Sequence, residues 1–220
     1  MSPIEKLKNI YSWPAERPPE FHPFYWSLDG GGKHLVQEAI ASRNSKILVE
    51  IGVFFAGSVL QWLSKCPDLT VIGIDPWDTN LADYYLENGK YYGDSIVKGN
   101  LTTEDLYNQL NLHEGAYLSM LSNTWDYQDR YIPMRGKSPE KLYELKDMGV
   151  IPDIVFIDSD KSGRDLEVCY ELFPDCTITG DDWNWTQDGK TCPIREAVES
   201  FAASKGLEIT VSRETWVLTK

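Results

Sequence analysis

Four aspartates are the residues of this sequence best suited to carry out chemistry. Asp158 and Asp160 follow one apolar, β-branched run, and Asp181 and Asp182 follow the next run of the same kind. If both runs are parallel strands of one sheet, their carboxyl ends lie at one edge and the four carboxylates come together there. Crowded carboxylates raise one another's pKa values, and a hard divalent cation relieves the repulsion. The pattern therefore predicts a metal site, and oxygen ligands with retained waters favour Mg²⁺.

A second candidate site follows the apolar run at residues 47–51. Glu50 and Gly52 end this run, and Gly57 and Ser58 begin a segment with helical periodicity. Gly52 permits a tight turn, Gly57 permits close approach of a ligand or a helix, and the free N–H groups that follow suit a carboxylate. A tight turn in an α/β protein of any function gives the same pattern.

Asp75 ends the next apolar run, 25 residues after Glu50. In nucleotide-binding α/β folds, a carboxylate at the end of the second strand accepts hydrogen bonds from ribose hydroxyls. Together with the glycine turn, Asp75 favours binding of a nucleoside or a dinucleotide.

The elements that position these residues alternate between strand and helix patterns. The expected strands are residues 47–51, 69–75, 131–136, 153–158, 177–179, 207–211 and 215–218. The expected helices are residues 34–41, a segment from 57 onward, 115–125, 138–148 with Ser138 as its cap, and 194–204. This order predicts an α/β fold with a doubly wound, mostly parallel seven-stranded sheet and a C-terminal antiparallel hairpin.

We expect an aromatic and proline-rich arm at residues 1–32 and a single domain at residues 33–220. The arm either lies on the domain or covers the entrance of a ligand site. Its aromatic residues are also compatible with a contact between subunits of a homo-oligomer. The connection at residues 77–112 is longer than usual, and we expect it to form a lid over an acceptor pocket. It contains Tyr84, Tyr85, Tyr91 and Tyr92. A peripheral insertion or a subunit contact is the alternative.

The composition limits the partners of the chain. With 21 basic and 34 acidic residues the net charge is −13, which disfavours nucleic acid and anionic membranes and favours a small-molecule partner. No apolar run is long enough to span a bilayer, and the first residues lack the apolar core of a signal peptide. The four cysteines form no CxxC pair, as expected for buried thiols in a reducing cytoplasm.

Several of these motifs resemble those of a known family. The turn Glu50-x-Gly52-x-x-x-x-Gly57-Ser58, the acidic residue Asp75 and the run from Phe156 to Lys161 resemble class I S-adenosylmethionine (SAM)-dependent O-methyltransferases. Asp181-Asp182 resembles the metal-dependent subtype, which includes catechol and caffeoyl-CoA O-methyltransferases. The form Gly180-Asp181-Asp182-Trp183 is more similar to macrocin- and novobiocin-type enzymes, which methylate sugar hydroxyls on natural products. The resemblance covers about residues 30–220 and implies a Rossmann-like fold.

The resemblance also implies a role for each matching residue. The expected cofactor-binding residues are Glu50, Gly52, Gly57 and Ser58 for the methionine part, Asp75 for the ribose, Gly136 and Ser138 for the adenine, and Asp158. The expected metal ligands are Asp158, Asp181 and Asp182. Lys161 matches the base of the catechol type, and Asp160 matches the base of the sugar type. The sequence departs from the pattern at Ala56, where the family has Gly, and at Asp182, where the catechol type has Asn.

Taken with these features, the resemblance implies a cytoplasmic, Mg²⁺-dependent enzyme that transfers a methyl group from SAM to a hydroxyl of a sugar or natural product. A catechol or phenol acceptor is the first alternative. An NAD-binding or non-catalytic protein of the same fold is the second, although the turn lacks the Gly-x-Gly-x-x-Gly spacing typical of dinucleotide sites.

Overall fold

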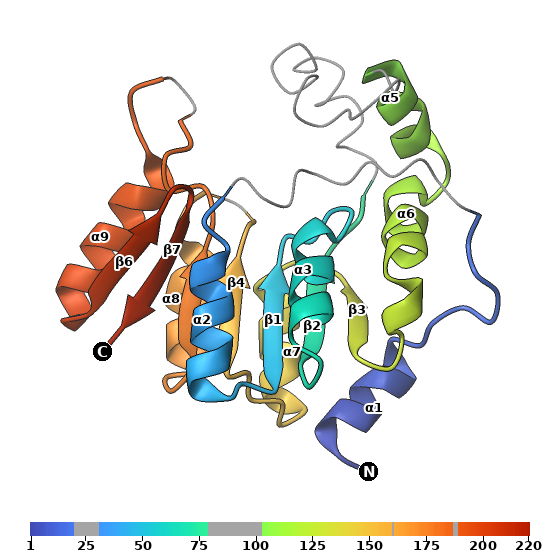
Figure 1. Cartoon of the computed structure of the whole chain (residues 1–220), viewed down its shortest axis with the longest axis horizontal. Coiled ribbons are helices and arrows are strands. Elements are labelled where there is room, and N and C mark those ends of the chain that lie inside the picture. The colour runs from blue at the N-terminus through green and yellow to red at the C-terminus, as the bar shows by residue number, and fades with distance from the viewer. Residues whose placement is uncertain (20–30, 79–102, 160, 187–188) are drawn as a thin grey trace.

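A seven-stranded sheet with helices on both faces forms the centre of the protein (Figure 1). The computed structural model describes residues 1–19, 31–78, 103–159, 161–186 and 189–220. The strands are β1 (Ile47–Ile51), β2 (Thr70–Asp75), β3 (Tyr131–Arg135), β4 (Ile154–Ile157), β5 (Thr177–Gly180), β6 (Glu208–Ser212) and β7 (Thr215–Thr219). The four insertion tyrosines, Asp160 and the arm residues 20–30 lie outside the described residues.

The strand order confirms the predicted topology. The strands lie in the order β3-β2-β1-β4-β5-β7-β6, and β1 pairs in parallel with both β2 and β4. Strand β7 runs antiparallel to β5 and β6 and forms the C-terminal hairpin with β6. Because the chain leaves β1 toward β2 and β3 and then returns to β4 on the other side, the connections change direction between β1 and β4. In open α/β sheets, ligands bind outside the carboxyl ends of the strands at this switch point.

Two apolar layers cover the sheet. The helices are α1 (Pro3–Ile10), α2 (His34–Arg43), α3 (Gly57–Lys65), α5 (Thr103–Asn111), α6 (Gly115–Asn123), the 3-10 turn η1 (Trp125–Tyr127), α7 (Glu140–Asp147), α8 (Arg164–Leu172) and α9 (Pro193–Lys205). Helices α2, α3 and α6 pack on one face, and α1, α7, α8 and α9 pack on the other. No helix in the described ranges is long and apolar enough to span a bilayer.

The alternation of side chains along the strands decides which residues reach each layer. On β1, Leu48 packs against α2 and α3, while Val49 and Ile51 pack in the opposite layer. On β4, Phe156 lies on the same face as Leu48. Since successive side chains of a strand point to opposite faces, Glu50 shares the face of Leu48 and lies under α3.

Helix α8 was not among the predicted elements, and the expected cap of α7 was wrong. Leu166, Cys169 and Phe173 are buried and three or four residues apart, so the helical signal was present in the sequence. No side chain caps α7, because the hydroxyl of Ser138 donates instead to the carboxylate of Asp165 on α8.

The described part of the N-terminal arm packs against the domain. Helix α1 begins at Pro3 with a capping box between Ser2 and Glu5, although the prolines of this region did not suggest a helix. Leu7 is fully buried in the layer that α7 covers. The indole N–H of Trp13 donates to a backbone oxygen of β3 at 3.1 Å.

We expect Leu7→Ala to lower the free energy of unfolding by about 2–5 kcal/mol, because it leaves a cavity under α1. Ile10→Ala on the same helix is the matched control, since Ile10 is 60% exposed, and its cost should stay below about 0.5 kcal/mol. Urea denaturation of both variants measures the difference. Equal effects of the two changes would contradict a docked α1.

Candidate functional site

The carboxyl ends of β1 and β4 meet at Gly52. Its φ of +86° lies in the left-handed region, and a Cβ at this position would overlap the carbonyl oxygen of Asp158. The amide of Gly52 donates to Ile74 at 2.9 Å, and the amide of Asp158 donates to Ile51 at 2.8 Å. A glycine is required here, because any side chain would push the two strand ends apart.

Glu50 is a fully buried carboxylate beneath this turn. One oxygen accepts a hydrogen bond from the Ser58 hydroxyl, and the other accepts one from the indole N–H of Trp62 at 2.7 Å. Burial raises the pKa of Glu50 to about 7, although both donors pull it down. Ser58 and Trp62 are four residues apart on α3, so they lie on one face of the helix and hold Glu50 together.

Asp75 fastens the turn after β1 to the end of β2. One of its oxygens accepts the amides of Val53 at 2.9 Å and Phe54 at 3.0 Å, and the other accepts the amide of Trp77 at 2.7 Å. Burial raises the pKa of Asp75, and the three amide donors oppose that rise. Asp75 therefore lies where the sequence predicts it, and it also organises the surrounding backbone.

Asp158, Asp181 and Asp182 form an acidic cluster with two lysines. The ammonium of Lys33 donates to Asp181 at 2.5 Å, and the ammonium of Lys161 contacts Asp182 and lies 3.7 Å from a carboxylate oxygen of Asp158. Burial lowers the pKa of each lysine, but the neighbouring carboxylates outweigh it, so that both lysine pKa values are raised. Both ammonium groups are therefore charged at neutral pH.

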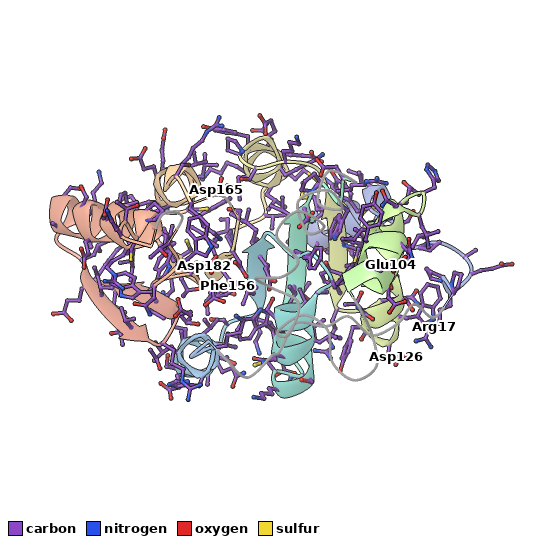
Figure 2. All side chains as sticks on the ribbon, turned by 90° about the horizontal axis from the view of Figure 1, so that it is seen from above. Arg17, Glu104, Asp126, Phe156, Asp165 and Asp182 are labelled. Carbon is purple, nitrogen blue, oxygen red and sulfur yellow. The ribbon has the colours of Figure 1, made fainter. Side chains whose placement is uncertain are left out.

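The acidic cluster lies at the middle of the carboxyl edge. Seen from above, Asp182 and Phe156 lie over the centre of the sheet, and Glu104, Asp126 and Arg17 lie toward the β3 side (Figure 2).

Removal from water raises the pKa of Asp158 well above its ordinary value. The charge of Lys161 opposes this shift, and the charges of Asp182 and Asp181 add to it.

The donor chemistry of the acidic cluster suits a divalent cation, but its present geometry does not form a ready metal site. Carboxylate oxygens are the ligands that Mg²⁺ prefers. Within the described ranges, however, no three His, Cys, Asp or Glu side chains come together as a ligand group. The two ammonium groups lie between the carboxylates instead, so a cation that binds Asp158 and Asp182 has to displace Lys161.

The two residues expected near the adenine lie on the neighbouring loop. Ser138 donates to one oxygen of Asp165, and Ser159 donates to the other at 2.6 Å. Asp165 is only 3% exposed, so it links the loop after β3 to the loop after β4. Gly136 has a φ of +151°, and the Lys141 side chain lies where its Cβ would be.

The sequence analysis missed Lys33, Trp62 and Asp165. Trp62 had a signal, because it follows Ser58 by one helical turn. Asp165 lies on the helix that was not predicted. Lys33 had no signal, since its partner Asp181 is 148 residues away.

We expect Glu50→Gln to change how stability depends on pH. The folded-state pKa of Glu50 is about 7 and its ordinary value is 4.5, so between these values the folded protein keeps a proton that the unfolded chain releases. The stability that Glu50 contributes is complete below pH 4.5 and is lost as the pH rises through 7. Relative to Glu50→Gln, the wild type should lose about 3 kcal/mol between these limits. Urea denaturation across pH tests this, and parallel curves would refute it.

Comparisons with known proteins support the fold. No protein-family model matches the sequence, and no curated protein is significantly similar to it. Among solved structures, an O-methyltransferase from Bacillus cereus in complex with SAH has a TM-score of 0.51 at 17% identity, and the match covers 99% of this chain and 90% of that one. Cofactor-bound Rv0187 from MTB has a TM-score of 0.52 at 16% identity, covering 97% of this chain and 86% of that one.

A third similar structure is the O-methyltransferase TomG from Streptomyces achromogenes, solved with SAM. Its TM-score is 0.52 at 14% identity, with 84% of this chain and 76% of TomG covered. All three similarities extend over most of both chains. The chain therefore has the Rossmann-like fold of class I O-methyltransferases.

Proposed function

We propose that this protein is a SAM-dependent O-methyltransferase acting on a hydroxyl of a small molecule. One observation carries the proposal: the glycine turn, with Glu50 and Asp75 around it, and the acidic cluster lie at the same switch point of the sheet. A cofactor over the turn would face an acceptor at the cluster. Three solved structures with this fold are O-methyltransferases or hold a bound cofactor, which adds support.

The turn offers SAM three kinds of contact. Gly52 and Gly57 allow the backbone to approach the methionine part, and Ser58 lies at the start of α3, where N–H groups favour a carboxylate. Ala56 has a φ of +66° and precedes that helix, so its methyl group borders the cofactor. Asp75 would accept ribose hydroxyls in addition to its three backbone amides, and Gly136 and Ser138 would border the adenine.

Methyl transfer requires an acceptor oxygen that has lost its proton and is aligned with the sulfonium methyl group. Holding both reactants in that geometry supplies about 7–11 kcal/mol of the barrier. Lys161 can serve as the base only after it leaves its carboxylate partners and gives up its proton, because its pKa is raised in their company. Asp160, the alternative base, lies outside the described residues. A sugar acceptor favours Asp160, and a catechol favours Lys161.

The proposed function includes a Mg²⁺ ion bound by the acidic cluster. Asp158, Asp181 and Asp182 would hold it, with Lys161 displaced from Asp158 and Asp182. Bound there, it would stabilise the oxyanion of an acceptor and so lower the pKa of the acceptor hydroxyl. Before a cation binds, the two lysines of the acidic cluster provide the positive charge that balances these carboxylates.

The acceptor and the cellular setting are proposed from the sequence and from one similar structure. The Gly180-Asp181-Asp182-Trp183 form supports a natural-product acceptor, and so does the similarity to TomG, which is involved in tomaymycin synthesis. The net charge of −13 supports a small-molecule partner over nucleic acid or an anionic membrane. The four cysteines without a CxxC pair support a location in a reducing cytoplasm.

Asp75→Asn should weaken SAM binding by about 1.5–3 kcal/mol, because ribose hydroxyls lose a charged acceptor. Asp78→Asn is the matched control, since Asp78 follows on the same connection and pairs with Lys137 at the surface at 3.8 Å. Isothermal titration with SAM measures both affinities, and urea denaturation checks that Asp75→Asn is folded. A folded Asp75→Asn variant with unchanged SAM affinity would remove Asp75 from the site.

The same titration decides between classes of function. We expect heat of binding with SAM and none with NAD. Binding of NAD instead would favour an oxidoreductase, and binding of neither would favour a non-catalytic protein.

The acidic cluster should bind one divalent cation per chain, and Asp182→Asn should weaken that binding, because one charged ligand is lost. Isothermal titration with Mg²⁺ and Mn²⁺ in the presence of SAH measures it. Methyl transfer to any acceptor that is found should stop with EDTA and return with Mg²⁺. Full activity after exhaustive chelation would make the enzyme metal-independent.

A further inference from the structure

A pocket lined by basic side chains lies beside the acidic cluster. It has a volume of about 250 Å³ and lies between the start of α2, the C-terminal half of α3 and the turn that joins β6 and β7. Its polar lining is formed by Lys33, His34, Gln37, Gln61, Lys65 and Arg213. Among the described residues that line it there is no Asp or Glu, although acidic residues outnumber basic ones 34 to 21 in the chain.

The walls of this basic pocket are fixed by backbone contacts. The carbonyl of Gly31 accepts the amides of Glu214 at 3.1 Å and Thr215 at 2.8 Å, and also the Thr215 hydroxyl at 2.5 Å. A Cβ at Gly32 would overlap the carbonyl of Ser212. The start of α2 therefore packs directly on the β6–β7 turn, and the space between them is part of the folded structure.

Two side chains connect the basic pocket to its surroundings. Lys65 donates to the side-chain oxygen of Gln37 at 3.4 Å, across the groove between α3 and α2. Lys33 lines the pocket, while its ammonium pairs with Asp181. The pocket thus adjoins the place where an acceptor hydroxyl would meet the acidic cluster.

Arg213 occupies a backbone position that does not favour arginine. Its φ is +54°, in the left-handed region where Gly, Asn and Asp are the common residues of tight hairpin turns. A residue kept in such a conformation costs stability and points to a role for its side chain. Here the side chain lines the basic pocket.

We propose that the basic pocket binds an oxyanion, a phosphate, sulfate or carboxylate group, that is carried by the methyl acceptor. Pockets that enclose whole ligands measure about 300–1,000 Å³, so this smaller one suits a single group. Because the net charge of −13 repels anions at a distance, local basic residues are what makes the binding favourable. The statement that the molecule bearing the oxyanion is the methyl acceptor rests on the proposed function. The binding of an oxyanion in the pocket does not.

Inorganic phosphate, titrated calorimetrically at constant ionic strength without SAM, tests the proposal. The wild type should bind it, and the double variant Lys65→Gln, Arg213→Asn should bind it at least about tenfold more weakly, through loss of two charge-assisted contacts. Lys205→Gln, which removes an exposed charge at the end of α9, should bind like the wild type. Arg213→Asn alone should unfold at the same temperature as the wild type or higher, because Asn tolerates the left-handed conformation.

Three results would overturn the proposal. These are no phosphate binding by the wild type at millimolar concentrations, an equal loss of binding in Lys205→Gln, and a weaker affinity for SAM when phosphate is present, which would assign the pocket to the cofactor's own carboxylate. Phosphate binding by a chain that fails to bind SAM would support the oxyanion pocket and reject the methyltransferase function.

Discussion

The repulsion among carboxylates at the carboxyl edge of the sheet is the constraint on which this site depends. Strands β4 and β5 are adjacent and parallel, so the acidic residues that follow them cannot separate. Their charges are balanced by Lys33, which precedes α2, and by Lys161, which follows β4. Removal of either ammonium would leave a carboxylate without its partner at a place partly removed from water, which is costly.

Lys33 reaches the acidic cluster only because a different part of the chain fixes the start of α2. Gly31 accepts hydrogen bonds from the β6–β7 turn and from Thr215, the first residue of β7, and the Thr215 hydroxyl also donates to Asp181 at 3.1 Å. The C-terminal hairpin therefore does more than close the edge of the sheet. It sets the position of one lysine and one carboxylate in the site, so the packing of the hairpin and the electrostatics of the site are linked.

Much of the fold could be predicted from the sequence, because each of the parallel strands is a short, mostly apolar run that ends at or next to a glycine or an acidic residue. The positions of Glu50, Asp75 and Asp158 at strand ends followed from this pattern. The lysine partners did not, since pairing between Lys33 and Asp181 depends on how α2 and β5 pack and not on any local period. The absence of a cap at Ser138 has the same origin, because its hydroxyl is used by Asp165 on a helix that the sequence analysis overlooked.

The two halves of the site differ in how firmly they are built. Around the glycine turn, every oxygen of Glu50 and Asp75 has a protein donor, and both carboxylates are buried, so this half is already in its final form before a ligand binds. In the acidic cluster the charged partners are lysine ammoniums on flexible stems, which a divalent cation can displace because it takes over their positive charge. An enzyme that holds its cofactor on rigid backbone and adapts its charged side chains to the acceptor would need this division. In the proposed enzyme, the rigid half would set the direction of the methyl group, and the adaptable half would decide which hydroxyl is brought to it.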